Sequence, residues 1–214
     1  MTDTAIDKAQ AEPFWARVRT ALGALRPEGE PAYGQAAIAR SIGIRPKLGL
    51  RIEEELVAGW SQAAGRHVSL CLLVIEIDRF ADYFAAYGPD QAEQCRLAML
   101  EAIRANLPRS DIQVLRLGPA GFVLVLPDLP ALMARAMAAR ITQSVLKLAL
   151  PHKESHAGSV TISIGLAVTN PQGNYDRKFF EAGAEALKQA RRKGLGRLHG
   201  VDLRPAQERR RRAA

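Results

Sequence analysis

The order of apolar patterns along the 214-residue chain predicts an α+β fold, with one largely antiparallel central sheet covered by helices. Residues 69–77 form a near-continuous apolar run of Leu, Val and Ile, as expected for a strand buried on both faces. Residues 159–168 place apolar side chains on alternate positions, which is typical of a second strand. Helical patterns separate and follow these strands, and this alternation favours a split βαβ sandwich.

The chain ahead of the first strand is predicted to contain two helices and a linker. Residues 1–11 are polar and predict a flexible leader. Residues 12–26 predict a short N-terminal helix, because apolar side chains recur there at helical spacing and Pro13 suits a first turn. Residues 27–47 are rich in Pro and Gly and predict a linker, and residues 50–64 predict an amphipathic helix.

The chain after the first strand is predicted to alternate helices with short strands. Two apolar runs, 112–117 and 122–126, are separated only by Gly118-Pro119-Ala120-Gly121, so they should pair as a tight hairpin. Residues 197–201 predict a short closing strand. The segments with helical periodicity are 89–107, 130–148 and 176–192.

These patterns divide the chain into three parts. Residues 1–47 form the leader, helix and linker, residues 48–203 form the folded domain, and residues 204–214 form a basic, disordered tail. Thirty Lys and Arg against 22 Asp and Glu give a net charge of +8, and the run Arg209–Arg212 supplies half of that excess. This tail is either a solvated end or a weak contact for nucleic acid or anionic lipid. We favour the solvated end and expect no nucleic-acid partner.

Composition and cysteine usage indicate a globular protein of the cytoplasm. Hydrophobic residues make up 48% of the chain and charged residues 24%, which is not the composition of a disordered chain. Cys71 and Cys95 have neither disulfide nor metal-ligand spacing, and Cys71 lies in an apolar run that predicts a buried thiol. The polar N-terminus predicts no signal peptide, and no apolar stretch approaches the ~20 residues of a membrane span.

Five segments together resemble the GGDEF family, which comprises the diguanylate cyclases and their non-catalytic relatives. Each segment is a weak signal alone, but all five occur in the family's order and at its separations. The resemblance covers about residues 48–202 and implies the nucleotidyl-cyclase-like sandwich of that family. The segments are Leu72-Leu73-Val74-Ile75-Glu76-Ile77-Asp78-Arg79-Phe80, Tyr87-Gly88, Arg116-Leu117-Gly118-Pro119-Ala120-Gly121-Phe122, Val160-Thr161-Ile162-Ser163-Ile164-Gly165 and Ala186-Leu187-Lys188-Gln189-Ala190-Arg191-Arg192-Lys193-Gly194.

The resemblance implies a degenerate signature. Active family members are homodimers that join two GTP molecules into cyclic di-GMP, using two metal ions, usually magnesium, held by carboxylates. In the segment Gly118 to Phe122, Ala120 stands at a metal-binding carboxylate, Gly121 at a catalytic acidic residue and Pro119 at a glycine. These positions offer no ligand atom, so we assign no catalytic residue. The turn should survive, with Pro119 at its first central position and Gly121 in an unusual backbone conformation.

Two acidic residues at the end of the first strand are the remaining candidates for a metal or nucleotide site. Glu76 stands where the family has its first metal-binding Asp, so it is the candidate metal ligand, and Asp78 matches the second Asp of that strand end. Either both carboxylates belong to a live site, or they are vestiges and Asp78 caps the following helix. We favour vestiges, and expect Mg²⁺ only if nucleotide binding persists.

Three further positions correspond to substrate contacts of the family. Phe84 and Glu93 stand where an Asn and an Asp contact guanine. Phe84 cannot form a hydrogen bond, and an unpaired guanine edge would cost ~1–3 kcal/mol per group. We therefore expect Phe84 to pack with the other aromatic residues of its helix. Arg191 replaces a phosphate-binding Lys and keeps its charge, whereas Leu195 stands where a second phosphate-binding Arg is expected.

A product-binding site is a weaker prediction. Many family members bind cyclic di-GMP at an Arg-x-x-Asp motif just before the signature. Arg109 and Asp111 supply both residue types, but they are one residue too close and Ile112 stands at the expected Asp. We favour a solvated Arg109 and an Asp111 that enters the strand, and keep product binding as the alternative.

The residues and the resemblance together predict a GGDEF-like domain without cyclase activity that acts as a regulatory or protein-interaction module in cyclic di-GMP signalling. The first alternative is a receptor that binds cyclic di-GMP or GTP without turnover. The second is a divergent active cyclase, which would need other carboxylates in place of Ala120 and Gly121. We expect a protein partner, either a second copy or another signalling protein.

Overall fold

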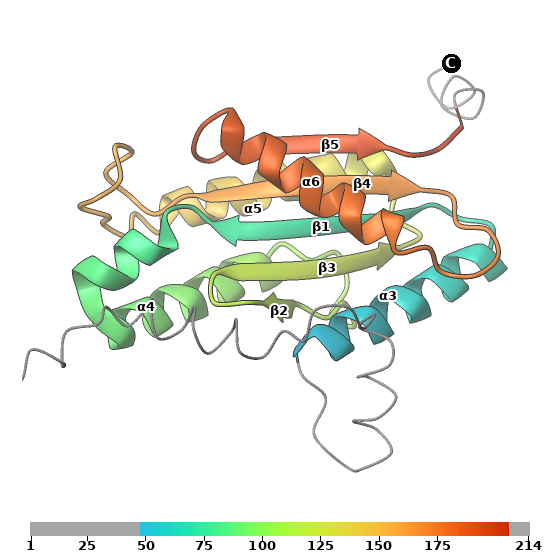
Figure 1. The fold of residues 1–214 in the computed structure, drawn as a ribbon, viewed down its shortest axis with the longest axis horizontal. Helices are drawn as coiled ribbons and strands as arrows, with labels where there is room; N and C mark the ends of the chain where they lie inside the picture. The colour runs from blue at the N-terminus through green and yellow to red at the C-terminus, as the bar shows by residue number, and fades with distance from the viewer. Residues whose placement is uncertain (1–47, 206–214) are drawn as a thin grey trace, which may run out of the picture. The chain divides into compact units, whose positions relative to one another are not determined.

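The computed structural model describes residues 48–205, so the predicted leader, N-terminal helix and linker lie outside the described residues, as does most of the predicted tail. The described chain forms a five-stranded sheet with helices on both faces (Figure 1). The elements are α3 (Leu48–Gly65), β1 (Leu70–Ile77), α4 (Phe80–Arg104), β2 (Leu115–Leu117), β3 (Gly121–Pro127), α5 (Ala131–Lys147), β4 (Ile162–Thr169), α6 (Lys178–Arg192) and β5 (Leu198–Asp202).

The strand order is β2-β3-β1-β4-β5, which confirms the α+β prediction and the hairpin. Strand β1 is antiparallel to both β3 and β4, whereas β4 and β5 are parallel. The centre of the sheet is therefore antiparallel, as predicted, and only its last pair departs from that pattern. Because β1 is central and covered on both faces, its side chains are buried throughout except at Glu76.

Two hydrophobic cores fill the two faces of the sheet. Helices α4 and α5 cover one face, and α3 and α6 cover the other (Figure 1). Helix α6 approaches β4 very closely, since a Cβ at Gly165 would lie 2.3 Å from the carbonyl oxygen of Gly183. This glycine contact fixes α6 on the sheet, and so sets where the basic C-terminal turn of α6 lies relative to the end of β1.

Helix α4 differs from its prediction. The periodicity predicted a helix starting at residue 89, but α4 begins at Phe80 and continues past Pro89. Gly88 has φ 81° and ψ 177°, so a break there accommodates the proline, which cannot donate a backbone hydrogen bond. Tyr83 stacks on Tyr87 at a ring-centroid distance of 4.6 Å, which confirms the predicted aromatic packing in this segment.

The ends of two other elements also differ from the predicted bounds. Strand β2 covers only Leu115–Leu117, because residues 112–114 form no ladder with β3. Arg204, which we placed in the tail, binds Asp202 through two side-chain hydrogen bonds of 2.9 and 2.7 Å. From Leu48 to Pro205, no helix has both the length and the apolar character needed to cross a membrane.

Candidate functional site

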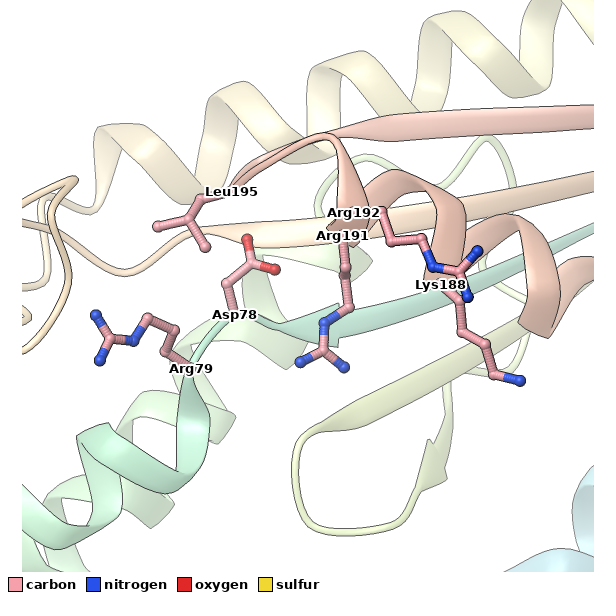
Figure 2. Close-up of a pocket in the computed structure, with 6 residues that line it drawn as sticks. All are labelled: Asp78, Arg79, Lys188, Arg191, Arg192 and Leu195. Carbon is pink, nitrogen blue, oxygen red and sulfur yellow. The ribbon is translucent and has the colours of Figure 1, made fainter.

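A basic pocket lies where the C-terminal end of β1 meets the last turns of α6 (Figure 2). Its volume is about 370 Å³. Asp78 enters from β1, and three basic residues come from α6 at helical spacing, so they share one side of that helix. The lining residues are Asp78, Arg79, Lys188, Arg191, Arg192 and Leu195.

Asp78 is a structural anchor at the floor of this pocket. It is only 2% exposed, and its carboxylate accepts hydrogen bonds from Thr161 Oγ1 and Ser163 Oγ, both at 2.7 Å. The backbone N–H of Gly196 donates a third bond of 2.8 Å. Asp78 thus ties β1 to β4 and to the loop after α6. The predicted helix cap is wrong, since α4 starts after a left-handed Arg79 without a side-chain capping bond.

Glu76 forms an ion pair with Arg191. Arg191 Nη1 donates to Glu76 Oε1 at 2.8 Å, so the candidate metal ligand and the candidate phosphate-binding residue neutralise each other. Burial raises the pKa of the Glu76 carboxyl, and the nearby Arg191 guanidinium opposes that shift. Opposite Glu76 in the sheet lie Gly121 of β3 and Ser163 of β4, so this pair sits beside the hairpin segment Gly118 to Phe122.

The signature hairpin keeps its turn but uses different residues from those predicted. Gly118 has the left-handed φ of 62°, whereas Gly121 already belongs to β3. Gly121 is required for another reason: a Cβ there would lie 2.5 Å from the carbonyl oxygen of Leu117. Ala120 accepts a backbone hydrogen bond of 3.0 Å from Ile77, and Arg96 Nη1 donates to the Pro119 carbonyl at 3.3 Å. The backbone of the hairpin therefore leaves no space for a side chain at position 121.

The two predicted guanine-contact positions lie away from the pocket. Glu93 pairs with Arg96 of its own helix and accepts a hydrogen bond of 3.0 Å from Arg116 of β2. Burial lowers the pKa of Arg96, and the neighbouring Arg116 lowers it further. Phe84 packs against the core between the sheet and helices α4 and α5. Neither Glu93 nor Phe84 lines the basic pocket.

Three residues of the basic pocket were not predicted as site residues. Lys188 and Arg192 lie three residues before and one residue after Arg191 on α6, so helical spacing was a signal that could have found them. Arg79 carried no such signal, because its place depends on the left-handed backbone between β1 and α4. The structure thus brings Asp78, Arg191 and Glu76 together and adds these three cations.

A second pocket, of about 740 Å³, is lined by α3, the end of α4 and the segment leading to β2, and contains the predicted product-binding residues. Arg109 Nε and Asp111 Oδ1 lie 3.4 Å apart, so the two predicted residues pair with each other. Arg51 of α3 and Arg104 of α4 also line this pocket. Three guanidinium groups from separate elements make it a candidate anion site, which the sequence indicated only in part.

The residues at the signature do not fit a two-metal centre. Asp78 has three hydrogen-bond donors on its carboxylate, and Glu76 is paired with Arg191. Throughout the described residues, no group of three or more His, Cys, Asp and Glu is placed to hold a metal ion. Hard cations such as Mg²⁺ require several oxygen ligands.

Two of the solved structures that resemble this chain are GGDEF proteins. The GGDEF domain of DgcB from Caulobacter crescentus, in complex with c-di-GMP, has a TM-score of 0.61 and 22% identity, covering 70% of this chain and 87% of that one. Diguanylate cyclase SiaD from Pseudomonas aeruginosa, in complex with its activator SiaC, has a TM-score of 0.61 and 20% identity, covering 87% of this chain and 70% of that one. Identities this low show the shared fold alone.

Sequence comparisons agree with the structural likeness. The probable diguanylate cyclase DgcC of Escherichia coli (strain K12) is 28% identical over 126 residues, which is 59% of this chain and 33% of that protein. The match thus spans about one third of that relative's length. The family model "Diguanylate cyclase, GGDEF domain" matches residues 50–197, well over half of the chain. The chain therefore belongs to the GGDEF family.

Proposed function

We propose that this chain is a GGDEF protein without cyclase activity that acts as a regulatory or protein-interaction module in cyclic di-GMP signalling. The observation that carries this proposal is the β2–β3 hairpin, which has neither acidic side chains nor space for one at position 121. Ala120 and Gly121 offer no carboxylate, and a Cβ at position 121 would lie 2.5 Å from the Leu117 carbonyl oxygen. This segment thus supplies no acidic side chain and, at position 121, no space for one, which supports the proposal.

The other polar residues of the site support the same proposal. Glu76 is held by Arg191 at 2.8 Å, and Asp78 is enclosed by hydrogen-bond donors. Recruiting either carboxylate to a cation would require these bonds to break. The SiaD relative was solved with an activator protein, which supports a role for such domains in protein complexes.

A turnover assay on the full chain tests the proposal. Purified protein is incubated with GTP and Mg²⁺, and in parallel with Mn²⁺, and cyclic di-GMP is quantified by chromatography and mass spectrometry. We expect no more product than a Glu76→Ala variant gives, because that variant lacks the one half-exposed carboxylate of the site. Product that the wild type forms and the variant does not would establish a cyclase and overturn the proposal. Equal traces from both proteins would identify a contaminant.

A receptor for cyclic di-GMP is the second candidate, favoured by the arginine-lined pocket of Arg51, Arg104 and Arg109. Arginine pairs well with phosphate, and cyclic di-GMP carries two phosphate groups. A ligand at 100 times its Kd adds about 2.7 kcal/mol of stability, or roughly 5–10 °C in Tm for a chain of this size. A receptor requires such a shift with cyclic di-GMP, lost in Arg109→Ala and kept in Arg191→Ala. Unchanged Tm values reject it.

A further inference from the structure

Exposed apolar side chains gather on helix α5. Seven large hydrophobic residues are exposed in the described part of the chain, and four of them lie on α5 or directly after it. Leu132 is the most exposed at 77%, and Met133 follows at 51%. Leu146 and Leu148 lie at the other end of the helix. Single exposed apolar residues are ordinary, but two at each end of one helix single out α5 as a candidate interaction surface.

The exposed residues of α5 follow the spacing of a helix-packing seam. Leu132, Ala136, Ala139, Gln143 and Leu146 are all exposed and are separated by alternate steps of four and three residues. This spacing defines one side of a helix and is the seam through which helices pair in coiled coils. We call these five residues the outer stripe. The buried face lies opposite, and comprises Ala134, Met137, Ala138, Ile141 and Val145.

The charges beside the outer stripe are all basic. Arg135 lies on one side of it, and Arg140 and Lys147 lie on the other, at the positions that select a partner helix by charge in coiled coils. No Asp or Glu occurs between Leu129 and Lys153. Within residues 48–205, none of these three cations forms an ion pair with an acidic side chain.

We propose that the outer stripe of α5 binds an amphipathic helix of a partner protein whose seam is flanked by Asp and Glu. The inference rests on the proposed role as an interaction module and names the surface that would serve it. Ala136 and Ala139 at the middle of the stripe let a second helix approach closely, because interaxial distance depends on the side chains at the contact. An acidic flank would pair with Arg135, Arg140 and Lys147.

Two other occupants fit the surface less well. A second copy of this chain would place basic flanks against basic flanks, which is unfavourable in a helix pair. An anionic membrane would gain apolar contact only from the ends of the stripe, because Ala136, Ala139 and Gln143 have little apolar surface to insert. Charge and side-chain size therefore select an acidic helix.

Designed peptides test this selectivity on the full chain. Two fluorescent three-heptad helices share a Leu and Ala seam but carry either Glu or Lys at every flanking position, and binding is followed by anisotropy. We expect the Glu peptide to bind at least about tenfold more tightly than the Lys peptide, since tenfold corresponds to only 1.4 kcal/mol. Ala139→Glu should abolish binding. Joint replacement of Arg135, Arg140 and Lys147 by Glu should reverse the preference.

The controls separate this proposal from the alternatives and from the proposed function. Leu97→Glu changes an exposed apolar residue of α4 outside the stripe and should leave binding unchanged. Equal affinity for both peptides, or full binding by Ala139→Glu, would overturn the proposal. So would self-association, or sedimentation with phosphatidylglycerol vesicles, that Leu132→Glu removes. Cyclic di-GMP production in the turnover assay would refute the inactive function without changing any of these peptide results.

Discussion

Replacing Asp78 with Ala distinguishes a structural anchor from a metal ligand. The Asp78 side chain is 2% exposed and accepts bonds of 2.7 Å from Thr161, 2.7 Å from Ser163 and 2.8 Å from the Gly196 N–H. Truncation would leave these three donors without their acceptor inside the protein. A residue whose role was to bind a cation would instead be replaceable with little change in the stability of the ion-free protein.

The size of the effect follows from these bonds. A hydrogen bond to a charged group contributes about 1.5–3 kcal/mol, so three bonds set an upper limit of roughly 5–9 kcal/mol. Each buried donor left without an acceptor costs about 1–3 kcal/mol, and the two hydroxyl groups can rotate toward other acceptors, so a net loss of about 3–5 kcal/mol is reasonable. We expect that loss in Asp78→Ala. For a chain of this size it lowers Tm by roughly 6–20 °C, at about 2–4 °C per kcal/mol.

Urea and thermal unfolding of the full chain, followed by circular dichroism with and without Mg²⁺, measure the effect. Asp82→Ala is the matched control, because Asp82 is exposed and pairs with Arg79 only three residues away; we expect a change of less than about 0.5 kcal/mol. Asp78→Asn keeps one acceptor oxygen and should fall between the wild type and Asp78→Ala. An unfolding midpoint of Asp78→Ala equal to the wild type would refute the anchoring role. So would a Mg²⁺-dependent stabilisation of the wild type that Asp78→Ala loses.

Three further predictions concern the same region and the buried thiols. Gly121→Ala should cost about 1–3 kcal/mol in urea unfolding, because its Cβ meets the Leu117 carbonyl, whereas Gly49→Ala, which has open space, should cost nothing. Burial raises the pKa of the Glu76 carboxyl in the folded protein above its ordinary value of 4.5. Ionising Glu76 therefore costs more in the folded than in the unfolded chain. Relative to Glu76→Gln, the wild type should lose stability as pH rises above about 4.5. A constant difference across that range would contradict this. Burial raises the thiol pKa of Cys71 to about 12 and of Cys95 to about 11, so Ellman's reagent at about pH 8 should label both only in unfolded protein.

Local sequence patterns predicted the fold well where burial is continuous. Strand β1 was found from its long apolar run of Leu, Val and Ile, and β4 from apolar side chains on alternate positions. The start of α4 was missed because Pro89 after Gly88 has the pattern of a helix beginning. In the structure Gly88 is non-helical and separates two helical segments of α4, so a helical segment does begin at Pro89 as predicted, and the segment from Phe80 to Tyr87 is the part that was missed.

The sequence identified several residues of the candidate site but not the contacts among them. Glu76 and Arg191 were each identified, yet their 2.8 Å ion pair depends on how α6 crosses the sheet. Gly121 was expected to matter for its dihedral angles, whereas it matters for its close approach to Leu117, a contact set by the hairpin register. Arg51 was not considered, because nothing in the local sequence links it to Arg109. Contacts between distant segments carry no periodic signal.

The charged side chains at the end of β1 are paired or hydrogen-bonded within the protein itself. In a metal-dependent site, cations balance clustered carboxylates. Here Arg191 balances Glu76, and hydroxyl and backbone donors satisfy Asp78, so both carboxylates are accommodated by the protein itself. Lys188 pairs with Glu185 at 3.3 Å, and Arg192 also lines the pocket wall. The pocket lining combines four basic side chains with the single buried carboxylate of Asp78, a charge balance that suits an anion and supports our proposal of a domain without cyclase activity.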